Sequence, residues 1–350
     1  CMRTPKEELS SSKLKRTALS AAIFSATALV SLGAIDQTAL APGFQMNSAV
    51  NPIHMTAVDL DGDGKVDLAV ANADTPGIGL FKNSLASGSK QLSAEAFTAL
   101  PSLAGIDRPH FVLAADIDGD GRVDLLTANY QGSTVSLFLN RSVPGEIKFE
   151  NRIDFTCGSN PISIAAGDFD GDGKLDLAVA LLNSNQVALM RNLGGSPISF
   201  AAPSLLTVGR NPFWIVAADL DGDGKLDLAT SDSNQNRVSV LRNAVPAGSS
   251  GILQFDSAVS FPVGATPQGL AASDLDNDGK LDLVTANYSQ GTFSVLRNIS
   301  VQGGINTNSF ATRTNFTAGA GSRAVGIGDI DGDGLQDVIV ANWSGQIGRA

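Results

Sequence analysis

The chain has 350 residues, of which 43% are hydrophobic and 17% charged, so it can build a large core and is unlike a disordered protein. Its formal net charge of −11 argues against a nucleic-acid-binding protein, which needs a basic face. With only two Cys and two His, the chain cannot form a disulfide scaffold or a Cys-based zinc site.

The first segment, residues 1–39, has the pattern of an export leader. Five basic residues fall within residues 2–16, and the uncharged, weakly apolar run TALSAAIFSATALVSLGAI follows from Thr17 to Ile35. Small residues occur at the sites that would allow cleavage after Gly33 or after Ala41. The alternative is a membrane anchor, because the run just reaches spanning length. Both alternatives export the rest of the chain, so we expect a secreted or cell-surface protein with no membrane span once the leader is removed.

From residue 40 onward the chain is built of one repeat. The pattern Asp-x-Asp-x-Asp-Gly-x-x-Asp begins at six positions, which are Asp59, Asp116, Asp168, Asp219, Asp274 and Asp329. The spacings are 57, 52, 51, 55 and 55 residues. A Phe nineteen residues before the first Asp, a Pro seven before it and an Asn twenty-four after it recur in most copies. Cys1 before Met2 and the break in the sixth copy suggest that the chain is a fragment.

Each repeat unit has the residue pattern of short β-strands. In the third copy, Phe149–Phe155 is extended, Ile162–Gly167 is a short run of small residues, and Asp176–Ala180 and Val187–Arg191 alternate with period two. Four short antiparallel strands in a unit of roughly 50 residues, repeated radially, predict an all-β β-propeller of four-stranded blades. A linear β-solenoid is the alternative, but its coils are usually shorter. Six repeats are visible, so the complete ring has six or seven blades, and residues 40–350 form the propeller region.

The Asp loops have the composition of calcium sites. Asp at positions 1, 3, 5 and 9, Gly at position 6 and an inward carbonyl at position 7 supply hard oxygen ligands without His or Cys. We therefore expect about six Ca²⁺ ions, one per repeat, each with an affinity of roughly 10⁻⁴–10⁻³ M. The predicted ligands, with the seventh position acting through its carbonyl, are Asp59, Asp61, Asp63, Lys65, Asp67; Asp116, Asp118, Asp120, Arg122, Asp124; Asp168, Asp170, Asp172, Lys174, Asp176; Asp219, Asp221, Asp223, Lys225, Asp227; Asp274, Asp276, Asp278, Lys280, Asp282; and Asp329, Asp331, Asp333, Leu335, Asp337.

Two other readings of the loops are weaker. An EF-hand requires a Glu at position 12 and flanking helices, whereas position 12 here is Val or Thr within a predicted strand. Asp residues that only cap turns would leave four carboxylates close together, and these would repel one another without a cation. The loops hold 24 of the 35 acidic residues, and six Ca²⁺ ions would bring the net charge from −11 to about +1. The acidity is thus explained by metal ligation, which we expect to be structural.

These units resemble the FG-GAP/VCBS repeat family, which includes the propellers of integrin α-subunits. The resemblance is carried by the DxDGDGKxDLAVAN words and the VSVLRN strand that follows, and it covers residues 40–350. It implies calcium loops between the first two strands of each blade, and adhesion or ligand binding in place of catalysis. The Phe-Gly and Gly-Ala-Pro words that name the family are missing.

Unusual residues gather opposite the Asp loops, among them an aromatic residue preceded by Asn fourteen positions after the first Asp of three repeats. Successive turns of antiparallel blades alternate between the two faces, so the turn after each DLAVAN strand lies on the other face from the Asp loop. Aromatic residues there could stack on a sugar while neighbouring amides fix its hydroxyl groups. Capped turns and packed aromatics are the structural alternative. The candidate ligand-binding residues are Asn129, Tyr130, Trp214, Asn287, Tyr288, Asn342 and Trp343.

Three functions follow from these patterns. The first is an exported, non-catalytic, calcium-binding propeller that binds a glycan or an extracellular protein as a monomeric ring. The second is a structural repeat module of a larger surface protein. The third is a propeller-based polysaccharide-degrading enzyme, which would need an acid/base pair outside the loops, and no repeat shows one. We expect no enzyme and no catalytic residues.

Overall fold

The computed structural model describes residues 51–74, 77–85, 94–343 and 348–349. The predicted leader, its cleavage sites and the start of the first repeat at residue 40 lie outside the described residues, so they stay predictions. Among the described residues, no helix combines the length and the apolar character that crossing a bilayer requires.

The fold consists of consecutive antiparallel sheets, in which each strand pairs with the next strand of the same sheet along the chain. Five sheets have four strands and the sixth has three described strands. Their strands are β1 (Pro52–Val58), β2 (Asp67–Asn72), β3 (Gly77–Asn83), β4 (Phe97–Ala104); β5 (Pro109–Ala115), β6 (Asp124–Asn129), β7 (Thr134–Phe138), β8 (Ile153–Thr156); β9 (Pro161–Gly167), β10 (Asp176–Leu181), β11 (Gln186–Met190), β14 (Ser204–Thr207); β15 (Pro212–Ala218), β16 (Asp227–Asp232), β17 (Arg237–Leu241), β18 (Val259–Pro262); β19 (Pro267–Ser273), β20 (Asp282–Asn287), β21 (Thr292–Leu296), β22 (Thr314–Thr317); and β23 (Ser322–Gly328), β24 (Asp337–Asn342), β25 (Gly348–Arg349).

Two short elements lie outside these sheets. A ribbon of β12 (Asn192–Gly194) and β13 (Ser199–Phe200) follows β11, and a single 3₁₀ turn, η1 (Ala94–Ala96), precedes β4.

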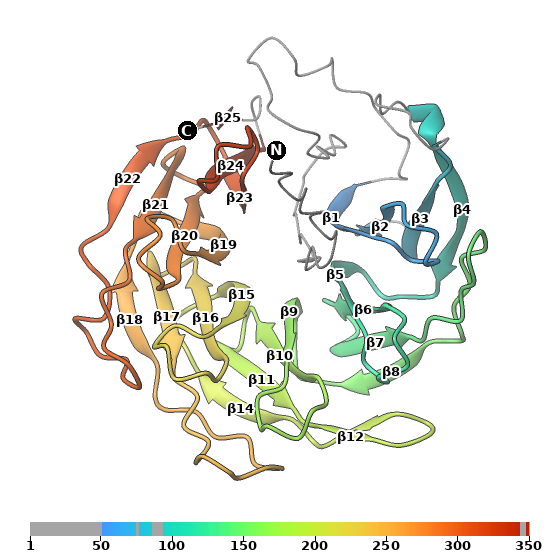
Figure 1. Ribbon diagram of the computed structural model, residues 1–350, viewed down its shortest axis with the longest axis horizontal. Coiled ribbons are helices and arrows are strands. Elements are labelled where there is room, and N and C mark those ends of the chain that lie inside the picture. The colour runs from blue at the N-terminus through green and yellow to red at the C-terminus, as the bar shows by residue number, and fades with distance from the viewer. Residues whose placement is uncertain (1–50, 75–76, 86–93, 344–347, 350) are drawn as a thin grey trace, which may run out of the picture.

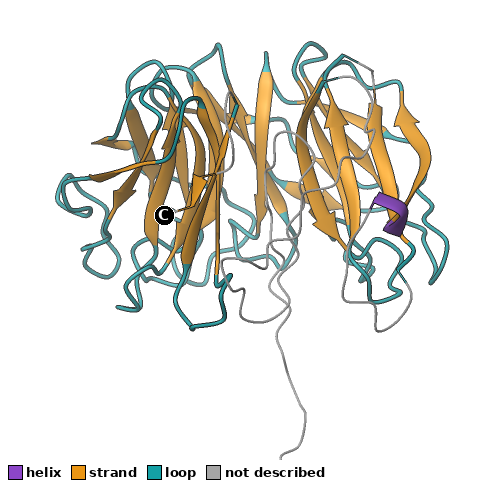
Figure 2. Ribbon diagram, turned by 90° about the horizontal axis from the view of Figure 1, so that it is seen from above, coloured by secondary structure: helices purple, strands orange, loops and turns teal. Residues whose placement is uncertain are grey.

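The sheets are arranged around a common axis as the blades of a β-propeller (Figure 1). The first strand of each blade is innermost and the last lies at the periphery, and the turns gather at the two ends of the strands (Figure 2). This confirms the predicted all-β propeller of four-stranded blades. Whether the complete ring has six or seven blades stays a prediction.

The blades are offset by one strand from the sequence repeat. The unit proposed from the sequence begins with the Phe149–Phe155 stretch, but β8 pairs with β7 and is therefore the outer strand of the preceding blade. The recurring Phe pairs with the recurring Asn near the end of the third strand of the preceding blade. Phe149 pairs in this way with Asn140, and Phe255 with Asn243. The predicted grouping of strands into blades was therefore wrong by one strand. The chain passes from one blade to the next after the outer strand, whereas the sequence unit placed the boundary before it.

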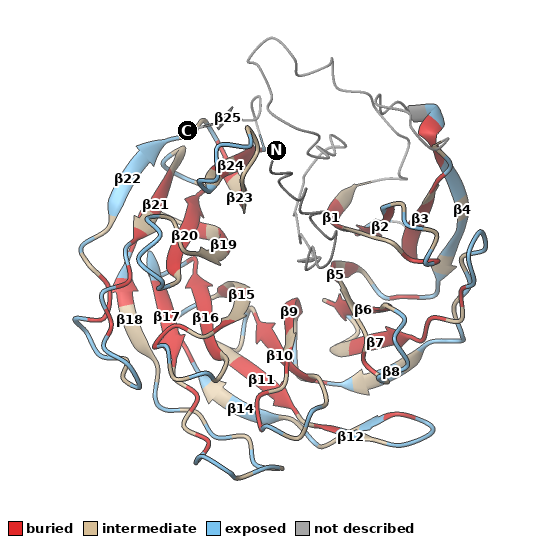
Figure 3. Cartoon of the chain, in the orientation of Figure 1, coloured by how far each residue is buried: buried red, intermediate tan, exposed pale blue. Residues whose placement is uncertain are grey.

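The core is divided among the interfaces between neighbouring blades. The second strands β2, β6, β10, β16 and β20 are buried along their whole length (Figure 3). For β6, β10, β16 and β20 this is because adjacent blades cover both of their faces. One apolar cluster joins Phe111 and Leu126 of the second blade to Ile164 and Leu177 of the third. Cys157 is buried in the same cluster, as expected of a small apolar side chain.

Small residues on the inner strands allow the blades to converge. A Cβ atom on Gly269 of β19 would lie 2.7 Å from the Cα atom of Ala324 on β23, so no side chain fits between these two backbones. The small-residue strands thus occupy the crowded inner edge, where the blades converge.

Candidate metal centre

The Asp loops connect the first and second strands of each blade, as β1 to β2 and β5 to β6. Because every loop has the same place in its blade, all six lie on one face of the disc, which we call the Asp face. The expected position 12, such as Val70, lies in the second strand, and no described helix flanks a loop. The EF-hand alternative is therefore excluded by the fold.

The first Asp of each loop organises its backbone. In the first loop, Asp59 accepts hydrogen bonds from the backbone N–H groups of Gly62 and Gly64, both at 2.8 Å. This tight wrap places Gly64 at φ +87°, where a residue with a side chain would be strained. In the fifth loop Asn277 takes the position of Gly62 and adopts φ 58°, as expected of an Asn that tolerates left-handed geometry.

The ninth-position Asp is buried beneath the loop. Asp67 accepts hydrogen bonds from the N–H groups of Leu60 at 2.9 Å and Asn83 at 2.8 Å, and Asp227 has the equivalent partners. Burial raises the pKa of Asp67, Asp124 and Asp176 to about 6 and that of Asp227 to about 7. The raised pKa reflects the free-energy cost of burying a charged carboxylate. A cation bound beside these carboxylates would offset this cost, since it favours the charged form.

The carboxylates converge as a hard-oxygen cluster. In each of the first four loops, oxygens of positions 1, 3 and 9 lie within 4.8 Å of one another, as in Asp59, Asp61 and Asp67. In the fifth loop the converging residues are Asp274, Asp276 and Asp278, at positions 1, 3 and 5. Three carboxylates with no nitrogen or sulfur donor fit Ca²⁺ or a similar hard divalent cation. The carbonyl ligand predicted at position 7 stays a prediction.

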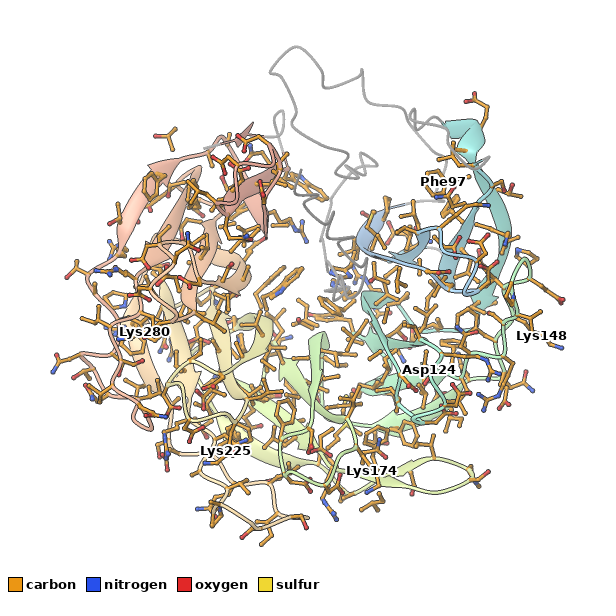
Figure 4. All side chains as sticks on the ribbon, viewed as in Figure 1. Phe97, Asp124, Lys148, Lys174, Lys225 and Lys280 are labelled. Carbon is orange, nitrogen blue, oxygen red and sulfur yellow. The ribbon has the colours of Figure 1, made fainter. Side chains whose placement is uncertain are left out.

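The fifth-position Asp turns toward basic side chains. The N–H of Lys65 donates to Asp63 at 2.9 Å, and the ammonium groups of Lys65 and Lys82 lie within 3.3 and 3.7 Å of the same carboxylate. Burial alone would raise the pKa of Asp63, but these contacts outweigh it and the pKa is lowered. Asp172 and Asp223 behave alike beside Lys174 and Lys225, which Figure 4 labels.

A second basic residue reaches each of the first five loops from the third strand or just beyond it. Arg242 binds Asp221 at 2.8 Å and Asp223 at 3.3 Å, and Arg191 binds Asp170 at 2.6 Å and Asp172 at 3.1 Å. The Arg of the VSVLRN motif makes this contact, a role that the sequence pattern alone does not indicate. These Lys and Arg side chains already screen the carboxylates at positions 3 and 5. Repulsion between the carboxylates is therefore weaker than the sequence pattern predicts, and so is the argument for bound metal that rests on it.

The recurring Asn twenty-four residues after the first Asp joins consecutive blades. The side-chain amide of Asn243 donates to the carbonyl of Leu226 in its own loop at 3.2 Å and to that of Phe169 in the preceding blade at 2.9 Å. Asn140, Asn192 and Asn298 make the same pair of bonds. We call this contact the inter-blade clasp. It explains a repeat signal whose role the sequence did not reveal.

The predicted ligand-binding residues lie at the face opposite the Asp face, which we call the open face. Asn129 and Asn287 are buried, and their amides bond to Ser136 and Ser294 within their own blades. Asn342 bonds to Ser322. These amides are therefore used inside the blades, whereas Trp343 is 50% exposed and can meet a ligand.

The other aromatic candidates pack against neighbouring side chains. Tyr130 stacks beside His110 with ring centroids 4.8 Å apart. Trp214 packs against His54 and Phe111. Tyr288 lies close enough to Arg323 to affect its pKa. Ligand binding by any of them stays a prediction.

The chain has relatives among proteins of known sequence. It is 31% identical over 163 residues to cartilage acidic protein 1 of Mus musculus, covering 42% of this chain and 25% of the relative, and the human protein matches equally. The chain thus spans about a quarter of the length of the curated relatives that it matches.

Solved structures share the fold at low sequence identity. A virginiamycin B lyase from Staphylococcus aureus matches with a TM-score of 0.52 and 14% identity over 86% of this chain and 80% of that one. An Agrocybe aegerita lectin that recognises non-reducing terminal N-acetylglucosamine matches with a TM-score of 0.52 and 15% identity over 87% and 83%. The FG-GAP-like repeat model matches residues 59–127, 116–179, 176–230 and 274–340, which is more than half of the chain. The chain belongs to the FG-GAP-like repeat family.

Proposed function

We propose that this chain is an exported, calcium-stabilised β-propeller that binds a glycan or a protein surface through its open face, without catalysis. The observation that carries the proposal is the contrast between the two faces. The Asp face repeats one carboxylate cluster from blade to blade, as expected of a structural device. The open face carries residues that vary from blade to blade: the position of Tyr130, for example, holds Leu182 in the third blade and Ser233 in the fourth.

Calcium is the cation that best fits the clusters. The donors are carboxylate oxygens held by backbone N–H groups, so their geometry is set before an ion arrives. Ca²⁺ accepts six to eight such oxygens with flexible geometry, whereas Mg²⁺ demands a near-ideal octahedron. An ion here would fix the loop between the first two strands, and its energy would add to the stability of the blade.

Export agrees with the family and with the matrix protein to which the chain is similar. Cartilage acidic protein 1 is named for an extracellular tissue, and the calcium affinity expected of such loops suits extracellular concentrations. The predicted leader supports the same compartment.

A non-catalytic role agrees with the groups on the open face. The ring nitrogens of His110 have no hydrogen-bond partner among the described residues, so no carboxylate orients this His as a general base. Likeness to a lyase at 14% identity concerns the fold alone. The alternative is a structural module within a larger protein. It is supported by the match to the curated relative, which covers only 25% of that protein's length.

Chelation tests the metal part of the proposal. EGTA should lower the melting temperature of the purified chain, and added Ca²⁺ should restore it by mass action, whereas Mg²⁺ at the same concentration should restore less. An unchanged melt in EGTA would remove the calcium argument.

A glycan array tests the binding part. Tyr130→Ala and Trp343→Ala should weaken binding to any glycan that the array identifies, while their melting temperatures report whether the fold is intact. Silence across the array would favour the structural module.

A further inference from the structure

A group of cationic and aromatic side chains lies at the open-face end of the propeller axis. The position six residues before the first Asp is the second residue of each inner strand, and it holds His110, Phe213, Gln268 and Arg323 in the second, fourth, fifth and sixth blades. The inner strands converge on the axis, so this position brings residues of separate blades to the same end of the axis (Figure 1). We call the axial cluster the residues Arg108, His110, Tyr130, Phe213, Arg323 and Trp343.

The contacts of the axial cluster form two groups, one joining the fourth and sixth blades and one within the second blade. The inner strands of these three blades meet one residue further along, where Phe111 and Ala324 both pack against Trp214. The guanidinium carbon of Arg323 lies 4.6 Å from the ring centroid of Trp343 and 5.8 Å from that of Phe213. His110 packs on Tyr130 at 4.8 Å, and the guanidinium carbon of Arg108 lies 5.8 Å from the same ring. Arg323 and Arg108 both act on His110, whose pKa is lowered to about 4 by burial first and by these two cations next.

Polar atoms are buried here without partners. The Nε atom of Arg108 and both ring nitrogens of His110 have no hydrogen-bond partner among the described residues. A buried polar atom costs free energy unless it is bonded, so a group of them in one place calls for an explanation. The hydrogen bonds of a ligand would supply one.

We propose that the axial cluster binds the carboxylate-bearing sugar ring of an acidic polysaccharide, such as a uronate. Two guanidinium groups offer forked donors that match a carboxylate, and Tyr130 and the half-exposed Trp343 offer flat faces for the apolar side of a sugar. His110 is neutral near pH 7, so one ring nitrogen donates to a hydroxyl oxygen and the other accepts from a hydroxyl hydrogen. This inference rests on the proposed function and names its ligand class.

An acidic peptide fits the same surface less well. A Glu or Asp side chain carries its carboxylate on a flexible stem and presents no ring face, so it would leave the aromatic side chains unused. A uronate unites a carboxylate, hydroxyl groups and an apolar ring face in one rigid residue. Because the carboxylates of the Asp loops lie on the other face, they do not oppose an anion at the axial cluster.

Calorimetric titration tests the assignment on the full chain with Ca²⁺ present. The probes are a short oligogalacturonate, its fully methyl-esterified form and a poly-glutamate peptide. The oligogalacturonate should bind, and its affinity should fall with added salt because the contact is ionic. The esterified form should bind roughly tenfold more weakly, because it lacks the charge-assisted hydrogen bond to the carboxylate. Equal binding of poly-glutamate would overturn the sugar assignment.

Matched variants locate the site. Arg323→Gln should weaken oligogalacturonate binding roughly tenfold, whereas Arg210→Gln, an exposed Arg on the turn before β15 of the same face, should leave it unchanged. Trp343→Ala, at a half-exposed position, repeats the test if Arg323→Gln lowers the melting temperature. Binding that survives both Arg323→Gln and Trp343→Ala would overturn the inference.

The proposed function can survive that outcome. If neutral glycans bind through Tyr130 and oligogalacturonate does not, the open face remains a binding surface and only the uronate assignment falls. The EGTA melt is independent of both results.

Discussion

His54 of β1 and Trp214 of β15 have ring centroids 5.3 Å apart, although they belong to the first and fourth blades. Phe111 of the second blade lies 3.8 Å from His54 and 5.2 Å from Trp214. All three residues occupy the position five residues before the first Asp, where the other blades place Ser163, Gly269 and Ala324. Three large rings and three small residues thus meet where the inner strands converge.

Truncation of Trp214 should destabilise the propeller. Trp214 packs into the clusters of several blade interfaces, so Trp214→Ala removes contacts from more than one blade at once. We expect a loss of about 2–3 kcal/mol in the free energy of unfolding, below the range for a fully buried Trp because Trp214 is partly exposed. Urea denaturation measures it. Trp343→Ala, at a residue 50% exposed, is the control and should cost much less; similar losses in the two variants would show that Trp214 does not join the blades.

Asp232 should make the protein less stable as the pH rises from about 4 to 6. This carboxyl is fully buried at a position where four of the other five blades have Asn, and burial raises its pKa to about 6 despite bonds from Ser239 and Thr230. Between the unfolded and folded pKa values the folded state binds more protons, so stability falls as pH rises through that window. Asp232→Asn should therefore gain about 2 kcal/mol at pH 7.5 and almost nothing at pH 4.

The fit of Asn at this position supports that sign. Asn287 occupies the equivalent place in the fifth blade, and its amide donates to Ser294, the counterpart of Ser239. Thermal melts of Asp232→Asn across pH 4 to 8 measure the effect. Asp107→Asn, at an exposed position, should change little at any pH. A gain that does not vary with pH would contradict the assigned charge state.

The sequence predicts whatever recurs by local rules. The Asp loops, the period-two strands and the small inner strands follow from residue type and spacing, so the propeller and its carboxylate clusters were predictable. Contacts between blades were not, because they join residues more than seventy positions apart, such as Asn243 and Phe169. The basic partners of positions 3 and 5 were missed because a Lys or Arg at a strand end is usually solvated. Of the axial cluster, Tyr130 and Trp343 were sequence candidates, but Arg108, Phe213 and Arg323 were missed because they come from separate repeats and differ in residue type.

Removal of one inter-blade clasp should weaken the junction between two blades. Asn243 is buried, and Asn243→Ala would leave the carbonyls of Phe169 and Leu226 without this donor. We expect a loss of about 2–4 kcal/mol in the free energy of unfolding, since each buried acceptor left unsatisfied is costly. Asn234→Ala is the matched control, because Asn234 is exposed and its side-chain amide donates to Asn211 on the neighbouring turn before β15. Equal stability of both variants would show that the clasp contributes nothing measurable.

The Arg at the end of the third strand should compete with calcium for the loop carboxylates. Arg242 bonds to Asp221 and Asp223, so it lowers the local negative charge that a cation would meet. Arg242→Gln should melt at a lower temperature than the parent protein in EGTA, because it loses these ion pairs. It should also show a larger rise on addition of Ca²⁺, because the freed carboxylates bind the ion more strongly. Arg237→Gln, at an exposed position of the same strand, keeps the change of charge but lies at the opposite end of β17. Melting curves over a series of Ca²⁺ concentrations compare the variants, and an identical calcium response in all of them would show that Arg242 and the ion do not share these ligands.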